Sequence, residues 1–402
     1  MKKRKFVSSP REGQPLTAAD KREMRRRQAR RQAIVRAVIV VLLLVAVVVL
    51  WQNWEYVASG RLMSGVENLV GAGTGSYPVD MSGTSVSRLA QVNNYAAVLT
   101  DSHLIYLNQT GAEVNRYVCA YPTALMRTAG KYVLVAEQGG RRLHLSTRSK
   151  VIKEFTADAD ILSVALNQKG QIAVMTDGPQ GYAVQIKVYD KTGKLLYTRN
   201  RNHVGTDMAL SPDGSQVTVL SVEAVNGSLN TTMDVFSLKT SDTEAVCSYV
   251  AKDRLLYRMA YLDGGWVAAF SDDCIVMLDT ADGLVTVYAP EDMHVLGFAV
   301  AGKDLAVAVR PYGDTGGGQV HIVNKKGAAT RVVNFTGEYR HLSGHDQRYV
   351  LLTDGYVQQI SASAEGTPVP VEADGQQVIL TDHQAVVLGL NRLAAYNLQE
   401  KQ

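Results

Sequence analysis

Two histidines in the stretch HLSGHDQ, His341 and His345, have a spacing at which paired imidazoles can bind one metal ion. Residues four apart share a face only in a helix, and the Ser343-Gly344 pair between them predicts a turn instead. The remaining histidines are scattered along the chain. We therefore predict no metal site.

The stretch Asp279-Thr-Ala-Asp282-Gly283 resembles the start of a calcium-binding loop, whose closely spaced carboxylates supply oxygen ligands. It lacks the later Asp or Asn and the distal Glu of such a loop, so we interpret it as a hairpin turn. The sequence contains no G-x-S-x-G elbow, phosphate-binding loop or dinucleotide-binding glycine pattern. We therefore assign no catalytic or cofactor-binding residue and expect no cofactor.

The three cysteines are Cys119, Cys247 and Cys274, and their spacings match neither a zinc site nor a disulfide framework. Each lies in apolar, strand-like sequence. We predict that all three are buried free thiols.

The elements that would position any site are short β-strands in a repeated order. In the stretch VYDKTGKLLY, Val188 to Tyr197, apolar and polar residues alternate on both sides of a Thr-Gly turn. This pattern predicts a β-hairpin. Related hairpins recur along the chain, each preceded by a short apolar run. These runs begin at residues 95, 132, 172, 217, 266, 305, 349 and 385, so the unit repeats eight times at intervals of 36 to 49 residues.

Repeats of this length with four short strands each are typical of propeller blades. One twisted four-stranded sheet cannot cover both of its faces, so blades stack radially and bury one another. We predict an all-β fold over residues 76–402, a β-propeller of about eight four-stranded blades, with seven as the alternative. The last unit has only about three strands, and SYPVDM (Ser76 to Met81) would supply the fourth and close the ring.

The first 75 residues have a different composition. An uninterrupted apolar run covers Ala37 to Leu50, and the uncharged sequence continues to Trp54, enough to cross a hydrocarbon core of ~30 Å. We predict a transmembrane helix over residues 37–54, with the lipid bilayer as the partner of Ala37-Trp54. An uncleaved signal anchor is the favoured interpretation, and cleavage near Ala58 is the weaker alternative.

Charge predicts the orientation of this helix. Residues 1–36 hold 13 Lys and Arg against three acids, a net charge of +10, whereas the whole chain carries +4. Because positive charge stays on the cytoplasmic side, we predict a basic cytoplasmic tail over residues 1–36 and an extracytoplasmic propeller after a juxtamembrane linker over residues 55–75. The arginine cluster Met24 to Arg36 has no aromatic residues between its arginines, so we expect no nucleic-acid partner.

Several turns resemble those of known propellers. YDKTGKLLY and LDTADGLVTVY resemble hairpins of quinoprotein-type and outer-membrane-assembly propellers, and ALSPDGSQVTVLS resembles a turn of WD40-like and TolB-like ones. Tyr197 and Tyr288 stand near where quinoprotein repeats have tryptophan, which argues against a quinone cofactor. The whole layout is similar to an uncharacterised family of single-pass, membrane-anchored propeller proteins of Gram-positive bacteria. That resemblance implies a fold and a location but no activity.

The predicted function is a non-catalytic binding or scaffold module of the cell envelope, with an envelope protein or a cell-wall polymer as ligand. The longest insertions, Gly178 to Tyr182, Glu223 to Thr232 and Pro311 to Gly318, all follow the second strand of their units. They should therefore emerge on one rim, as binding loops of repeat proteins do.

Two alternatives stay open. One is a hydrolase or lyase of cell-surface glycans with its site in the propeller channel, and the other is a ligand sensor that signals through a partner. Several carboxylates with a His or Arg in the channel would favour the enzyme. A channel lined by small apolar and hydroxyl residues would favour binding. The sequence indicates no oligomeric state.

Overall fold

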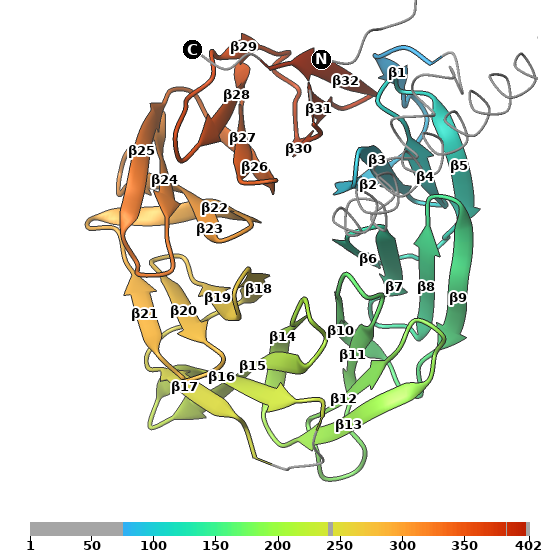
Figure 1. The fold of residues 1–402 in the computed structure, drawn as a ribbon, viewed down its shortest axis with the longest axis vertical. Helices are drawn as coiled ribbons and strands as arrows, with labels where there is room; N and C mark the ends of the chain where they lie inside the picture. Colours follow the sequence, from blue (N-terminus) through green and yellow to red (C-terminus); the bar gives the residue numbers. More distant parts are fainter. Residues whose placement is uncertain (1–74, 240–243, 383, 399–402) are drawn as a thin grey trace, which may run out of the picture. The chain divides into compact units, whose positions relative to one another are not determined.

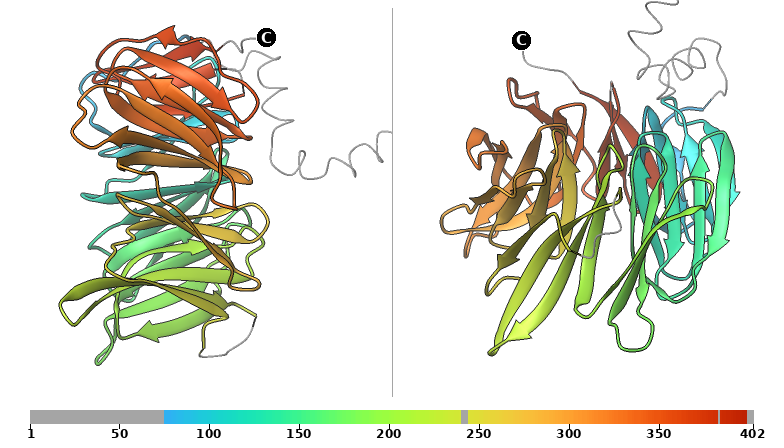
Figure 2. Two further views of the ribbon diagram at one scale, coloured as in Figure 1. Left: turned by 90° about the vertical axis from the view of Figure 1, so that its left-hand side faces the viewer. Right: turned by 60° about the horizontal axis from the view of Figure 1, so that its bottom comes forward.

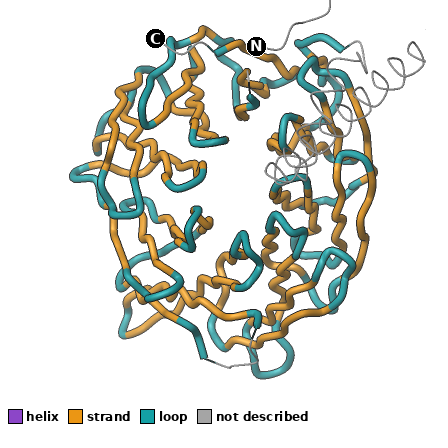
Figure 3. The backbone as a smooth tube through the Cα atoms, in the orientation of Figure 1, coloured by secondary structure: helices purple, strands orange, loops and turns teal. Residues whose placement is uncertain are grey.

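The computed structural model describes residues 75–239, 244–382 and 384–398. Their strands form eight four-stranded sheets, which are arranged as the blades of a ring around a central channel (Figure 1). The described residues contain strands, loops and turns but no helix (Figure 3), and hence no helix that could span a membrane. The predicted tail, transmembrane helix and nearly all of the linker lie outside the described residues.

Each blade has the same strand order from the channel outward, and the blades are numbered 1 to 8 by their innermost strands. The innermost strands are β2 (Val86–Val92), β6 (Ala124–Ala129), β10 (Ile161–Leu166), β14 (Val204–Leu210), β18 (Arg258–Leu262), β22 (Met293–Ala301), β26 (Tyr339–His345) and β30 (Gln377–Leu380). The second strands are β3 (Tyr95–Thr100), β7 (Tyr132–Glu137), β11 (Ile172–Asp177), β15 (Gln216–Val225), β19 (Trp266–Phe270), β23 (Asp304–Pro311), β27 (Arg348–Thr353) and β31 (Gln384–Leu388).

The outer half of each blade completes the sheet. The third strands are β4 (His103–Leu107), β8 (Arg142–Thr147), β12 (Val184–Tyr189), β16 (Ser228–Ser237), β20 (Ile275–Asp279), β24 (Gly318–Val323), β28 (Tyr356–Ser361) and β32 (Arg392–Asn397). The outermost strands are β5 (Glu113–Val118), β9 (Lys150–Thr156), β13 (Leu195–Arg201), β17 (Cys247–Ala251), β21 (Val285–Tyr288), β25 (Ala329–Phe335), β29 (Val369–Pro370) and β1 (Val79–Asp80). Neighbouring strands are antiparallel throughout, as in the hairpin that pairs Val188 with Tyr197.

The ring closes by pairing the two ends of the described chain. Strand β1 lies in the same sheet as β30, β31 and β32, with Val79 opposite Leu393 and Asp80 opposite Arg392. The Met81 amide also donates to the Asn391 carbonyl oxygen at 2.8 Å. The prediction that Ser76 to Met81 supplies the missing strand of an eighth blade is therefore confirmed, and the seven-blade alternative is wrong.

The hydrophobic core is divided among the blade interfaces. Eight clusters of buried side chains each join two consecutive blades, including one that joins blade 8 to blade 1. Each second strand contains a run of consecutive buried residues, as in Tyr95–Thr100 and Trp266–Phe270. This burial explains why the second strands are continuous apolar runs in the sequence. The side views show the stacked sheets (Figure 2).

Side chains stabilise the hairpin turns that made the repeat visible. Asp190 Oδ1 accepts from the Thr192 amide at 2.8 Å, the Thr192 hydroxyl at 2.6 Å and the Lys194 amide at 3.0 Å. Gly193 has a φ of 89°, which favours glycine. Asn residues accept from the same backbone positions at Asn108, Asn167 and Asn324. The repeated Asx-x-x-Gly pattern is thus a turn-forming device.

One local prediction was wrong. His341 and His345 lie in the same strand, β26, and the turn follows at Asp346 and Gln347, both with positive φ. Ser343 and Gly344 pair with Val350 and Tyr349 inside the sheet. Gly344 reads as a turn residue in sequence, but the strand needs it because a Cβ there would lie 3.0 Å from both Ala301 and Val300.

Leu393→Ala should weaken ring closure. Leu393 is fully buried in the cluster that joins blades 8 and 1, so the lost contacts should cost about 3 kcal/mol of unfolding free energy. Leu195→Ala is the matched control because Leu195 is 49% exposed, and its effect should stay within about 0.5 kcal/mol. Urea unfolding of the full-length chain measures both, and equal effects would contradict the closure.

Candidate functional site: a rim of loops and a basic channel

The strand order divides the loops between two faces of the ring. Connections from second to third strands, and from each outermost strand to the next blade, emerge on one face, which we call the rim face. The remaining turns form the opposite, turn face. Residues 178–183, 226–227 and 312–317 all join second to third strands. The prediction that the three insertions share one rim is therefore confirmed.

The middle insertion differs from its predicted form. The stretch Glu223 to Thr232 is not a loop, because β15 and β16 run through it as ten-residue strands. Only Asn226 and Gly227 form the turn, with φ values of 52° and 85°, as expected for a two-residue hairpin. Blade 4 therefore raises a rigid hairpin from the rim face where the sequence had indicated a variable loop.

Six exposed apolar side chains lie at the rim-face ends of blades 3 to 5. We call this group the rim sector, and it consists of Tyr182, Val204, Val225, Leu229, Leu255 and Tyr257. Each is between 39% and 61% exposed. Large exposed apolar groups that cluster on one face are typical of interaction surfaces.

Hydrogen bonds fix the loop that carries part of the rim sector. Thr231, fully buried in β16, donates from its hydroxyl to the Arg254 carbonyl oxygen at 2.8 Å and accepts from the Leu256 amide at 3.1 Å. Arg254 Nε also lies 3.0 Å from Asp273 Oδ2. The loop that presents Leu255 is therefore held in place before any partner binds, which lowers the entropic cost of binding.

The central channel is basic. Among the eight innermost strands, which are wholly within the described residues, there are four arginines and a single carboxylate, Asp207. Arg88, Asp207 and His341 each follow a β-bulge in their strand. Bulges re-aim side chains and occur often beside functional sites. This channel matches neither sequence expectation, since it has neither several carboxylates nor a lining of small apolar and hydroxyl residues.

Asp207 is held by three neighbouring blades. Its Oδ2 accepts from the Met259 amide at 3.0 Å, and its Oδ1 accepts from the Ser163 hydroxyl at 3.1 Å. Arg127 lies 3.7 Å from Oδ1. Glycoside hydrolysis uses two facing carboxyl groups, whereas the described innermost strands offer this one, already committed to hydrogen bonds.

His341 is held neutral in the channel. Its Nδ1 lies 3.1 Å from the Val378 carbonyl oxygen and 3.3 Å from the Val378 amide nitrogen, which joins blade 7 to blade 8. Burial, together with weaker repulsion from Arg88 and Arg258, lowers the pKa of His341 to about 4, although the hydrogen bond to Val378 opposes the shift. The imidazole therefore serves as a neutral hydrogen-bonding group at pH 7.

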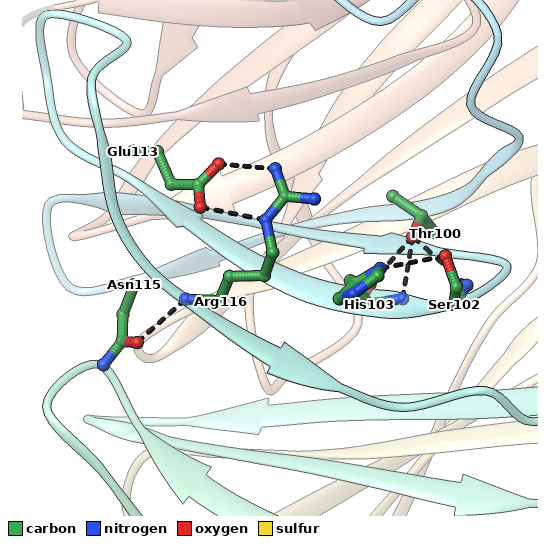
Figure 4. Close-up of polar contacts among 6 residues, drawn as sticks. All are labelled: Thr100, Ser102, His103, Glu113, Asn115 and Arg116. Atoms are coloured by element: carbon green, nitrogen blue, oxygen red, sulfur yellow. Dashed lines mark hydrogen bonds and ion pairs between the residues drawn. The ribbon is translucent and has the colours of Figure 1, made fainter.

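A serine and a histidine are in contact on blade 1. His103 Nδ1 lies 2.9 Å from Ser102 Oγ, and nearby Glu113 pairs with Arg116 (Figure 4). The Asp101 carboxylate accepts from Ser102 and not from the imidazole. A catalytic triad needs the carboxylate on the second ring nitrogen, so this group is a turn and not a nucleophile.

Three potential metal ligands meet on the turn face. His345 Nε2 lies 3.4 Å from Asp346 Oδ2 and 3.4 Å from Asp382 Oδ1, and the ligand atoms all lie within 4.8 Å of one another. Asp382 also accepts from Arg348 through its carbonyl oxygen at 3.0 Å. These contacts join blades 7 and 8 without requiring an ion. His341, in contrast, points to a different partner, so the two histidines are not joint ligands.

The cysteines are free, as predicted. Cys119 and Cys274 are buried, and burial raises the pKa of each thiol to about 12. Cys247 is only partly buried, which corrects the prediction for this residue. Burial also raises its pKa, so none of the three has the character of a reactive thiolate.

The channel arginines are the residues that sequence reasoning missed. Arg88, Arg127 and Arg258 each interrupt the first apolar run of a repeat, in VSRLA, ALMRTA and YRMAYL. A charge inside an apolar strand was the available signal. That charge can be interpreted only once it is known that the first strand of each unit lines the channel.

Comparison with solved structures finds similar chains, among which BamB reaches a TM-score of 0.50. BamB of Moraxella catarrhalis has a TM-score of 0.50 at 10% identity, over 80% of this chain and 99% of that chain. Hydrazine synthase of Kuenenia stuttgartiensis has a TM-score of 0.45 at 14% identity, over 67% of this chain and 92% of that chain. The WD40 domain of Neurospora crassa Pan2 has a TM-score of 0.47 at 10% identity, over 78% of this chain and 89% of that chain. At these identities the similarity concerns the fold alone.

A protein-family profile also matches the chain. It covers residues 75–366, from β1 to β28, and describes a family of unknown function (DUF5711). No curated protein matches the chain.

Acid should destabilise the fold partly through His341. Because its folded pKa of about 4 lies below the ordinary value of 6.5, the unfolded state binds more protons between these pH values. Stability is therefore lost as pH falls from 6.5 to 4, by up to about 3 kcal/mol from this group. His341→Gln should lose less stability than the wild type over that window in urea unfolding. Parallel losses in the two proteins would contradict the assignment.

Proposed function

The chain belongs to this family of unknown function, and we propose that it is a membrane-anchored binding or scaffold module whose propeller binds an envelope protein through the rim sector. The rim sector is the observation that carries this proposal. Protein interfaces are enriched in aromatic anchors surrounded by less important contacts, and Tyr182 and Tyr257 are suited to that role. A cell-wall polymer is the alternative ligand.

The fold supports a binding role in a second way. The rim sector draws on three consecutive blades, so a partner would contact a surface that the stacked sheets keep rigid. Tyr257 directly precedes Arg258 of β18, so the rim sector extends to the mouth of the channel. The single carboxylate of the innermost strands gives no matching support for a glycan hydrolase.

The membrane location rests on the sequence of residues 1–54. The apolar run over residues 37–54 and the net charge of +10 over residues 1–36 support a single membrane span with the propeller outside the cytoplasm. In that arrangement the partner would be an envelope protein or a wall component.

Tyr312→Cys should react with a membrane-impermeant maleimide in intact cells. Tyr312 is 63% exposed on the rim face. Cys119 and Cys274 are buried, and the partly buried Cys247 also has a raised pKa, so background labelling should be low. Ser9→Cys in the basic tail is the matched control and should label only after lysis. Labelling of Ser9→Cys but not of Tyr312→Cys in intact cells would indicate the opposite orientation.

A photo-crosslinking amino acid at Tyr257 should capture one envelope protein in living cells, whereas the same amino acid at Leu195 should not. Leu195 begins an outermost strand next to the turn face and is 49% exposed, so it controls for exposure. The double variant Tyr182→Ser, Leu229→Ser should reduce the product by about tenfold, because both side chains would lie in the interface.

Two results would contradict the proposed interface. One is equal capture from Tyr257 and Leu195, and the other is capture that the double variant leaves unchanged. Capture of a glycan polymer in place of a protein would favour the alternative ligand.

A further inference from the structure

Two hairpin turns on the turn face bring a histidine and two aspartates together. His345 ends β26 and Asp346 follows it in blade 7, and Asp382 lies in the corresponding turn after β30 of blade 8. His345 Nε2 lies 3.4 Å from Asp346 Oδ2 and 3.4 Å from Asp382 Oδ1, and the ligand atoms all lie within 4.8 Å of one another. The sequence pattern paired His345 with His341, whereas the ring supplies a carboxylate from the next blade.

The imidazole nitrogen between these carboxylates lacks a hydrogen bond. His345 Nε2 is a buried atom that makes no hydrogen bond with the described residues, although both carboxylates lie near it. A buried polar nitrogen without a hydrogen-bond partner costs free energy and calls for an explanation. The ring nitrogen is thus aimed at neither oxygen, which is the geometry expected when all three atoms face a common ion.

The spacing of the three atoms fits a metal ion. Two ligand atoms that each lie about 2.1 Å from one ion, at the tetrahedral angle of about 109°, are about 3.4 Å apart. Both distances from His345 Nε2 have this value. A neutral imidazole and two carboxylates together carry two negative charges, which balance a divalent cation. The imidazole favours zinc and related transition metals over calcium and magnesium.

The turns that carry the three side chains are held in place by the fold. The turn of blade 7 contains only Asp346 and Gln347, whose φ values are 47° and 61°. Arg348 follows this turn and donates from Nη1 to the Asp382 carbonyl oxygen at 3.0 Å, which joins it to blade 8. The side chains of Asp346 and Asp382 are partly exposed. An ion would therefore meet ligands that are already positioned and would have a path from solvent.

We propose that His345, Asp346 and Asp382 bind one divalent transition-metal ion of the zinc type between blades 7 and 8. Three protein ligands leave a fourth coordination position for water or for an oxygen atom of a bound molecule, as in open zinc sites. The ion links blade 7 to the blade that closes the ring. The site lies on the face opposite the rim sector and does not depend on the proposed protein partner.

The test uses the purified full-length chain in detergent, without a histidine tag and after treatment with a chelator. Isothermal titration with Zn²⁺ should give one saturable site, whereas Mg²⁺ and Ca²⁺ should bind much more weakly. Co²⁺ should occupy the same site and give the visible absorption of a tetrahedral complex. Zn²⁺ should also raise the melting temperature, because it binds the folded chain through ligands from two blades.

Variants of the three ligands should lose the ion. His345→Gln, Asp382→Asn and Asp346→Asn should each weaken Zn²⁺ binding at least about tenfold, because each removes a metal ligand. Asparagine tolerates the positive φ of position 346. His203→Gln is the matched control, because His203 Nδ1 lies 3.3 Å from a single carboxylate, that of Glu223, on the rim face. This variant should bind Zn²⁺ like the wild type.

Two outcomes would overturn the site. One is Zn²⁺ binding no tighter than Mg²⁺ binding, which would leave a protonated His345 between two carboxylates as the explanation of the contacts. The other is a double variant, His345→Gln, Asp382→Asn, that binds Zn²⁺ and gives the Co²⁺ spectrum as the wild type does. That result would assign the ion to other groups, such as the cysteine thiols. The Co²⁺ spectrum of the wild type tests the site even if a variant fails to fold.

Discussion

The closure of the ring by β1 is the constraint on which the other features depend. Each blade buries its faces only against two neighbours, so an open array would expose the faces of its first and last sheets. Two residue pairs between β1 and β32, together with the buried cluster around Leu393, close the last gap. The rim sector and the channel exist only because the blades are then fixed around one axis.

Closure also explains how residues far apart in the sequence form one channel. Arg88 and Arg258 are 170 positions apart, yet the ring places both on innermost strands, in blades 1 and 5. Hydrogen bonds between innermost strands, such as Asp207 to Met259 and Gln377 to the Leu89 amide at 2.9 Å, join neighbouring blades at the channel. Polar side chains of the innermost strands therefore hold the channel together as well as line it.

The sequence predicted the architecture better than the sites. The second strands are continuous apolar runs because both of their faces are buried, so their repetition identified the blades and their number. Ser76 to Met81 was recognisable as the closing strand because the last unit lacked one. The position of the arginines on the channel strands was not predictable, since Arg88 or Arg258 alone looks like an isolated charge in a strand. At Ser343-Gly344, close packing in the sheet overrode turn propensity.

Hydrogen exchange of the intact full-length protein tests the closed ring most directly. The amides of residues 79–81 should be protected about as strongly as those of residues 392–397, because the two segments share one sheet and Met81 donates to Asn391. Rapid exchange over residues 79–81, with blades 2 to 7 still protected, would contradict the closure. In that case neither the position of the rim sector nor the arrangement of the innermost strands around the channel would stand.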